Sequence, residues 1–226
     1  MVLWDIDQTL IEVGGATRLA YAAAFAKAVG RPLDRPWEFN GRTELGAVAH
    51  VLDAHGVEST PELTDAFVAQ IVSELHDRAG DIRRDGRVLP GAVDALRATA
   101  RLPGVHQSVL TGNLYPLAVL KLDIFELAGF VNLRIGAFGG DDVDRLALPA
   151  HAWRRAQDQL GHRFDGRDTV IVGDTLLDVA TGKAAAARVV AVATGPAAAA
   201  DLAAAGADVV LPDLRDTAAV VAAITG

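Results

Sequence analysis

The chain has 226 residues, of which 51% are hydrophobic and 22% are charged, and its formal net charge is −8. This composition excludes an intrinsically disordered protein, and the absence of cysteine excludes disulfide scaffolds, thiolate metal sites and cysteine nucleophiles. The acidic balance argues against nucleic acid as a partner, because binding a phosphate backbone needs an excess of Lys and Arg.

The first predicted element is a strand over residues 2–4, which is short, apolar and followed at once by acidic residues. The segment that comes next, from residue 14 to residue 86, contains only helical patterns. Ser, Thr and Asp are favoured N-caps, and Pro is favoured at the first helical position. The helices predicted on these signals run over 21–29, 43–55 with Thr43 as N-cap, and 60–79 with Thr60 as N-cap.

After residue 86, short runs rich in Val, Ile and Leu alternate with helical patterns. Runs of this length are typical of buried parallel strands. The predicted strands cover residues 108–110, 133–138, 169–172, 189–193 and 207–211. The predicted helices cover residues 91–102, 116–127, 149–160, 179–187 and 196–205. The alternation predicts an α/β fold, a Rossmann-like doubly wound sheet whose strands are mostly parallel.

The helical segment over 14–86 is too long for an ordinary crossover between two strands. We therefore predict that it forms an all-helical cap inserted after the first strand. Residues 1–13 and 87–226 would then make up the α/β catalytic core. Gly14-Gly15 and Asp85-Gly86 are the expected hinges, since Gly tolerates backbone conformations that other residues avoid.

No apolar run is long enough to span a membrane, so we expect no membrane partner. Residues 1–7 lack the basic and apolar regions of a secretion signal, which predicts a cytoplasmic protein. The sequence leaves the oligomeric state open. It also contains no spacing of histidines that is typical of a zinc site.

Polar residues follow three of the predicted strands directly. Because the carboxyl ends of parallel strands form the ligand crevice of an open sheet, these side chains should converge on one site. Several carboxylates in a small volume need a compensating cation, and Mg²⁺ prefers such oxygen ligands. A hydroxyl and backbone N–H groups at a helix start suit phosphate. The set consists of Asp5, Asp7, Thr111, Gly112, Asn113, Asp174 and Asp178.

The same segments resemble the motifs of the haloacid dehalogenase-like (HAD) hydrolases. Residues 5–10, DIDQTL, resemble the DxDxT signature, and residues 109–113, VLTGN, resemble the second motif. Residues 172–178, VGDTLLD, resemble the fourth motif, GDxxxD. The resemblance covers nearly the whole chain and is strongest to the phosphoglycolate phosphatase-like group with a helical cap. It implies a Mg²⁺-dependent phosphatase that hydrolyses a small phosphorylated metabolite.

The resemblance also implies roles for the acidic residues. Asp5 would attack phosphorus and form an aspartyl phosphate, while Asp7 would act first as general acid and then as general base. Asp5, the backbone carbonyl of Asp7 and Asp174 would hold Mg²⁺, and Asp178 would orient its ligands. The phosphoryl oxygens would be bound by Thr111 and the backbone of Gly112 and Asn113.

The chain departs from the family pattern at two positions. Gln8 stands where most members have Gly, which implies a modest change in the turn. The third motif usually contributes a Lys followed by Pro, and that position falls near Ala147. Either Arg145, just upstream, or Lys121, in the helix after the second motif, would then balance the charge of Asp5 and the phosphate. We favour Arg145, because Lys121 would have to reach back along its helix.

The cap would select the leaving group. Arg42 stands at a predicted helix start and could bind a substrate carboxylate or phosphate, although a solvated Arg explains it equally well. Thr17 and Arg18 are more simply interpreted as surface residues. Phosphoglycolate is the first candidate substrate by resemblance only.

Four alternatives stay open. A phosphomutase would need a cap that recaptures an intermediate, and a phosphonatase would need Lys27, the single lysine of the cap, to form a Schiff base. A non-catalytic phosphate-binding relative with a decayed site would explain the missing third-motif Lys. A phospho-accepting signalling receiver would leave Asp7 without a role. Dehalogenation is disfavoured, because it needs neither Asp7 nor Asp174.

Overall fold

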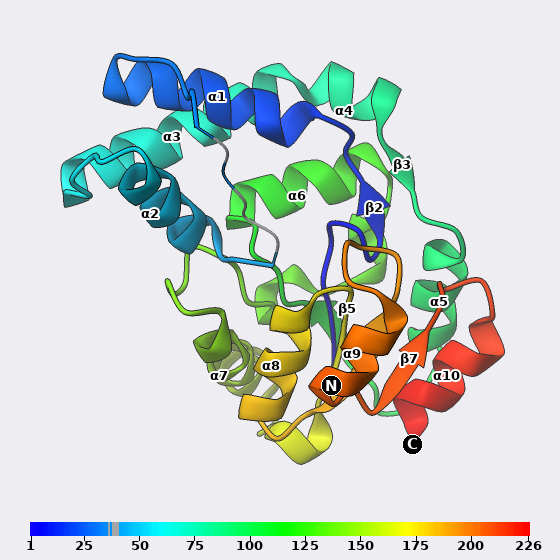
Figure 1. The fold of residues 1–226 in the computed structure, drawn as a ribbon. Helices are drawn as coiled ribbons and strands as arrows, with labels where there is room; N and C mark the ends of the chain where they lie inside the picture. Colours follow the sequence, from blue (N-terminus) through cyan, green and yellow to red (C-terminus); the bar gives the residue numbers. More distant parts are fainter. Residues whose placement is uncertain (36, 38–40) are drawn as a thin grey trace.

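The computed structural model describes residues 1–35, 37 and 41–226. Five parallel strands form the main sheet in the order β4-β1-β5-β6-β7 (Figure 1). Their bounds are β1 Val2–Trp4, β4 Gln107–Val109, β5 Val170–Gly173, β6 Arg188–Val192 and β7 Val209–Leu211. The helices that follow residue 86 are α5 Ala92–Thr99, α6 Tyr115–Ile124, α7 Leu148–Leu160, α8 Leu176–Ala184, α9 Ala199–Ala205 and α10 Thr217–Thr225. The predicted α/β fold with a mostly parallel sheet is confirmed.

The sheet has helices on both faces because successive strand residues point in opposite directions. Leu3 and Ile171 belong to the apolar cluster that includes α7, whereas Trp4 and Val172 belong to the cluster that includes α5, α6 and α10. All four side chains are fully buried. This two-sided burial explains why the strands read as continuous apolar runs in the sequence.

One predicted strand is wrong. The segment 133–138 contains a short 3-10 helix, η2 (Leu133–Ile135), and pairs with the edge of the sheet through a single bridge between Leu110 and Ala137. The side chain of Asn132 accepts a hydrogen bond from the backbone of Arg134 and so closes the turn before a strand can begin. A short polar cap thus prevails over the apolar content of the segment.

Between the first strand and residue 86, the described residues form four helices: α1 Ala16–Val29, α2 Glu44–Ala54, α3 Pro61–Asp77 and α4 Ala79–Asp85. The helix caps predicted at Thr43 and Thr60 are confirmed, since their hydroxyls accept hydrogen bonds from the backbone of Gly46 and Leu63. Helix α4 was not predicted. Helix α1 begins five residues before its predicted start at Tyr21.

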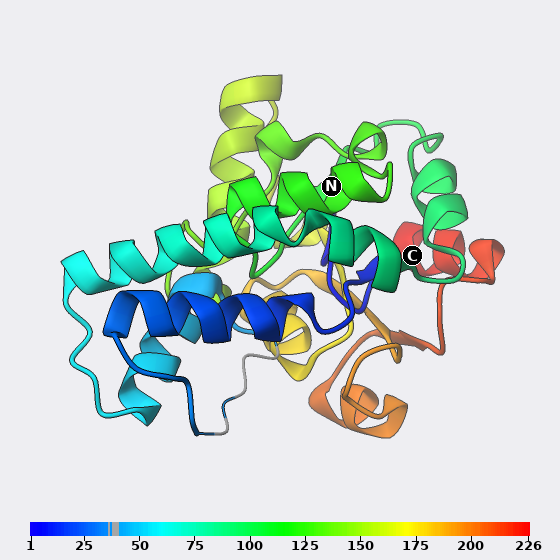
Figure 2. The ribbon, with the colours of Figure 1, turned by 90° about the horizontal axis from the view of Figure 1, so that it is seen from above.

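The four helices leave and rejoin the rest of the chain at one place. A short strand β2 (Ile11–Glu12) pairs in antiparallel fashion with β3 (Arg87–Val88), so that the two connecting segments lie side by side. Helices α1 and α3 pack against each other (Figure 2) through aromatic side chains, with the rings of Phe25 and Phe67 5.8 Å apart. Sequence reasoning missed this two-residue ribbon, because it is too short to show a period.

Within the part of the chain that the structure describes, no helix has both the length and the apolar character needed to span a membrane.

Glycine at position 91 should be required by both its backbone angle and its surroundings. Gly91 and Gly104 both have positive φ, but a Cβ on Gly91 would collide with the backbone of Leu214, whereas a Cβ on Gly104 would meet no atom within 4 Å. Gly104→Ala should therefore cost only left-handed strain, about 1–2 kcal/mol. Gly91→Ala should cost about 1–3 kcal/mol more. Urea denaturation measures both free energies of unfolding, and equal losses would contradict this account.

Candidate active site

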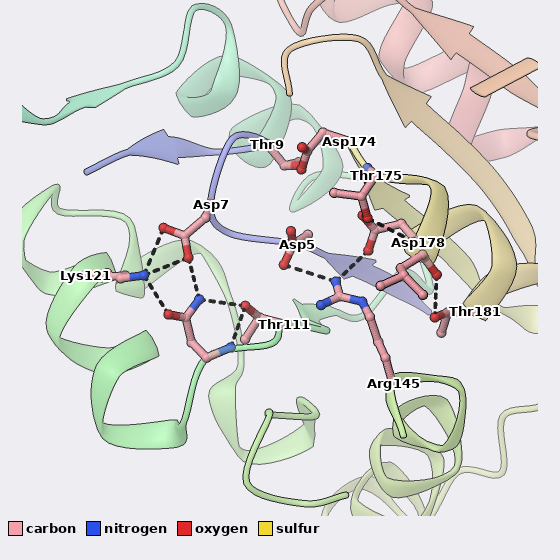
Figure 3. A network of polar contacts seen from close by, with 12 residues as sticks. Asp5, Asp7, Thr9, Thr111, Lys121, Arg145, Asp174, Thr175, Asp178 and Thr181 are labelled. Carbon is pink, nitrogen blue, oxygen red and sulfur yellow. Dashed lines mark hydrogen bonds and ion pairs between the residues drawn. The ribbon is translucent and has the colours of Figure 1, made fainter. Parts of the chain in front are cut away.

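The carboxyl ends of β1, β4 and β5 meet in one cavity, which has a volume of about 930 Å³ when its opening to solvent is counted. Asp5 follows β1, Thr111 follows β4 and Asp174 follows β5, in the order that the parallel sheet requires. Figure 3 shows these side chains together with both candidate cations. The predicted residues that line the cavity are Asp5, Asp7, Arg42, Thr111, Gly112, Asn113, Lys121, Arg145 and Asp174.

Arg145 forms a buried ion-pair network with two of the predicted carboxylates. It lies in the 3-10 helix η3 (Arg145–Ala147), and its Nη2 is 2.5 Å from Asp178 Oδ1 and 3.3 Å from Asp5 Oδ1. Asp178 also accepts hydrogen bonds from the backbone and hydroxyl of Thr175, at 3.0 and 2.6 Å. The bond from the Thr175 backbone, together with the bond that the Asp178 backbone N–H donates to Thr175 Oγ1 at 3.2 Å, forms the capping box that starts α8. Asp178 is thus held by its own helix and in turn orients Arg145 beside Asp5.

Asp174 completes a cluster of three buried carboxylates. One oxygen from each of Asp5, Asp174 and Asp178 lies within 4.8 Å of the others. Burial, together with mutual repulsion, raises the pKa of Asp174 to about 9 and that of Asp5 to about 7. The Arg145 guanidinium opposes both shifts without removing them. Three carboxylate oxygens this close, with a single guanidinium among them, fit a hard divalent cation.

Lys121 lies at the other side of the cavity and contacts Asp7 instead of Asp5. Its Nζ is 2.9 and 2.7 Å from the two carboxylate oxygens of Asp7 and 2.6 Å from Asn113 Oδ1. Asn113 Nδ2 donates to Asp7 Oδ2 at 2.7 Å and to Thr111 Oγ1 at 2.8 Å. Lys121 thus reaches back along its helix to the start of α6, where it contacts Asn113 and Asp7, while Arg145 is the cation beside Asp5.

The first turn of α2 lies directly on the loop that contains Thr111. The backbone N–H of Glu44 donates to Gly112 O at 2.7 Å, and a Cβ on Gly112 would collide with the carbonyl of Arg42. The buried Glu44 carboxylate accepts a hydrogen bond from the hydroxyl of Tyr21 at 2.5 Å. Burial raises the pKa of Glu44, although the Tyr21 hydrogen bond and the charge of Lys121 oppose the shift.

Sequence reasoning missed part of the cavity wall. Thr17, Arg18 and Tyr21 of α1 line the cavity, although the first two were interpreted as surface residues. The Arg18 guanidinium lies 5.6 Å from the centre of the Trp37 ring. Residues 17 and 18 are four and three positions before Tyr21, so they share its face of the helix. A helix predicted from residue 16 instead of residue 21 would have shown this grouping.

Gln8 has a positive φ of 61°, which explains why Gly is usual at this position in the family whose motifs the sequence resembles. Its backbone N–H donates to Ile11 O, and its carbonyl accepts a hydrogen bond from the hydroxyl of Thr194. The turn is therefore kept in the left-handed conformation by bonds at both ends.

The chain belongs to the haloacid dehalogenase-like hydrolase family, because a profile of that family matches residues 2–183. A curated relative, described as the plasmid phosphoglycolate phosphatase of Cupriavidus necator, is 29% identical over 219 residues, covering 95% of this chain and 89% of the relative. These matches agree with the resemblance carried by the three motifs.

Solved structures share the fold over nearly the whole chain. A hydrolase from Pseudomonas syringae superposes with a TM-score of 0.73 at 20% identity, covering 96% of this chain and 95% of that one. A putative beta-phosphoglucomutase from Bacteroides vulgatus superposes with a TM-score of 0.72 at 19% identity, covering 100% of this chain and 90% of that one. At these identities the likeness establishes the fold alone.

The acidic cluster should make the metal-free protein less stable as the pH rises. An unfolded Asp loses its proton near pH 3.9, whereas folded Asp5 and Asp174 keep theirs to about pH 7 and 9. Between these values the unfolded state binds fewer protons, so stability falls with rising pH. The melting temperature in EDTA should decline from pH 5 to pH 9, and Asp174→Asn should flatten the decline.

The matched control for this measurement is Asp158→Asn, which changes an exposed carboxylate of α7. It should leave the pH dependence unchanged. A wild-type melting temperature that does not vary with pH in EDTA would contradict the raised pKa values of the buried Asp5 and Asp174.

Proposed function

We propose that the protein is a Mg²⁺-dependent phosphatase that hydrolyses a small phosphorylated metabolite through an aspartyl phosphate on Asp5. The observation that carries this proposal is the placement of Asp5. Its carboxylate belongs to the acidic cluster and lies 3.3 Å from the Arg145 guanidinium, in a cavity that also contains the Asp7 carboxylate and the Thr111 hydroxyl. Two anions, a carboxylate and a phosphate, can meet only where positive charge and hydrogen-bond donors are already in place.

In the first step, one oxygen of Asp5 attacks phosphorus and the bond to the leaving oxygen breaks. Asp7 gives its proton to that oxygen, so an alcohol leaves and a phosphoryl group stays on Asp5. Arg145 balances charge beside the nucleophile. The Thr111 hydroxyl and the backbone of Gly112 and Asn113 supply the donors for the phosphoryl oxygens.

In the second step, water attacks the phosphorus of the aspartyl phosphate. Asp7, now a carboxylate, accepts a proton from that water, and the bond between phosphorus and the Asp5 oxygen breaks. Inorganic phosphate leaves, and both carboxyl groups return to their starting states.

The residues that would hold Mg²⁺ are Asp5, the backbone carbonyl of Asp7 and Asp174. Asp178 would orient these ligands without being one of them. A bound Mg²⁺ neutralises charge that builds up on the phosphoryl oxygens. The raised pKa values of Asp5 and Asp174 support this assignment, because a cation there would relieve the repulsion that raises them.

We also propose that residues 14–86 act as a cap that excludes water and selects the leaving group, with residues 1–13 and 87–226 as the catalytic core. Arg18 and Arg42 support this proposal, because both line the cavity and neither forms an ion pair with any described residue. Two guanidiniums without a carboxylate partner among the described residues favour a leaving group that has its own negative charge. Phosphoglycolate, whose carboxylate is close to its phosphate, is the first candidate.

The nucleophile can be tested by Asp5→Asn. Phosphate release from p-nitrophenyl phosphate and from a panel of metabolite phosphates, including 2-phosphoglycolate, should need Mg²⁺ and stop in EDTA. The variant should lower kcat/KM at least about a thousand-fold, because the covalent route is lost. Asp123→Asn, at an exposed carboxylate of α6, is the matched control and should retain full activity. Unchanged turnover in folded Asp5→Asn protein would reject the proposal.

The role of Arg42 can be tested by the charge of the leaving group. Arg42→Met should lower kcat/KM for 2-phosphoglycolate about 10- to 100-fold, the usual range for losing one charge-assisted hydrogen bond. It should change kcat/KM for ethyl phosphate, which has a neutral leaving group, by less than about threefold. Arg134→Met, at an exposed Arg of η2, should affect neither substrate. Equal losses on both substrates would show that Arg42 does not recognise the charge of the leaving group.

A further inference from the structure

The two cations of the site are paired with different carboxylates. Arg145 contacts Asp5 and Asp178, whereas Lys121 contacts Asp7 and, within the described part of the chain, forms no ion pair with Asp5. Since Arg145 already balances the charge beside the nucleophile, Lys121 is not needed there. Its burial therefore calls for another explanation, because an ammonium is rarely placed in the interior without a specific partner.

Lys121 and Asn113 hold the Asp7 side chain from two directions. Lys121 Nζ reaches both carboxylate oxygens, and the Asn113 amide donates to one of them. Lys121 also fixes the amide of Asn113, whose Nδ2 is tied in turn to the Thr111 hydroxyl. Lys121, Asp7 and Asn113 form a closed ring of hydrogen bonds, and Asn113 connects this ring to the Thr111 hydroxyl (Figure 3). The ring sets the position of Asp7 relative to the phosphoryl-binding hydroxyl.

The ring of hydrogen bonds is buried at Lys121 and open to the cavity at Asp7. The side chain of Lys121 is 3% exposed, whereas that of Asp7 is 35% exposed. The charge of Lys121 also acts on the buried Glu44 carboxylate of α2, where it opposes the rise in the pKa of Glu44 that burial causes. Water is thus kept from the ammonium but not from the carboxylate, which leaves Asp7 free to meet a leaving group.

We infer that Lys121 is a positioning residue that acts through Asp7 and serves departure of the leaving group, a task separate from that of Arg145. This inference rests on the proposed function. A general acid must stand within hydrogen-bond reach of the oxygen that it protonates, and a small error in its placement is costly. The missing third-motif Lys is then accounted for by two residues. Arg145 balances the charge beside Asp5, and Lys121 positions Asp7 for departure of the leaving group.

Leaving groups that differ in basicity give the decisive test. An alkyl phosphate expels a strongly basic oxygen and needs the acid, whereas p-nitrophenyl phosphate expels a stable phenolate and needs it little. General acid catalysis contributes about 10²–10⁴-fold. Lys121→Met should therefore lower kcat/KM for an alkyl phosphate by about 100-fold or more, and for p-nitrophenyl phosphate by less than about 10-fold. The ratio kcat/KM is the proper measure, because it reports the step in which the leaving group departs.

Asp7→Asn should give the same selective loss. Because Lys121 acts through Asp7, the double variant should be no worse on the alkyl phosphate than Asp7→Asn alone. Lys183→Met, at an exposed lysine of α8, is the matched control and should change neither substrate. If circular dichroism shows that Lys121→Met does not fold, Lys121→Gln replaces it, since Gln retains one donor for Asp7.

The outcomes separate the two proposals. An active wild-type enzyme with equal losses on both substrates in Lys121→Met, or with fully additive losses in the double variant, would overturn the inference alone. A wild-type enzyme that releases phosphate from no ester would overturn the proposed function and the inference with it. A selective, non-additive loss would establish the division between Lys121 and Arg145.

Discussion

The burial of negative charge at the carboxyl ends of β1 and β5 is the constraint on which the rest of the site depends. Asp5, Asp174 and Asp178 are almost fully removed from water, and like charges at this range cannot all stay ionised without compensation. Arg145 supplies part of the positive charge, and a divalent cation fits the remainder. The arrangement is unfavourable for an empty protein and suits one that must bring a carboxylate and a phosphate into contact.

The helices that cover the cavity are tied to this same region. Glu44, in the first turn of α2, bonds to the loop after β4, and Tyr21 of α1 bonds to Glu44. Under the proposed function, the cavity wall that faces the substrate would therefore come from α1 and the start of α2, while the reacting groups would come from the strand ends. Because the two sets of side chains belong to different elements, the set that would select the leaving group can vary while the reacting groups stay the same.

Residues that follow a strand could be predicted well from sequence, because chain order and parallel pairing fix where strand ends lie. This holds for Asp5, Thr111 and Asp174. The partners of Lys121 and Arg145 could not be predicted, because they depend on how α6 and η3 cross the site, and spacing along the chain does not contain that information. The false strand at 133–138 has a similar cause, since a single side-chain bond from Asn132 outweighs an apolar pattern. The departures at Gln8 and near Ala147 were visible in the sequence, but only the backbone angle and the position of Arg145 explain them.

The central claim is that a phosphoryl group is held covalently on Asp5, and trapping that intermediate tests it most directly. In Asp7→Asn, p-nitrophenolate can still leave, but the water of the second step lacks its base, so the intermediate should accumulate. The protein is mixed with p-nitrophenyl phosphate and Mg²⁺, quenched in acid, digested and examined by mass spectrometry. The account predicts one phosphoryl group on the peptide that contains Asp5, and none when Asp5→Asn is added to the variant. Turnover with no phosphoryl group on that peptide, or with one attached elsewhere, would contradict it.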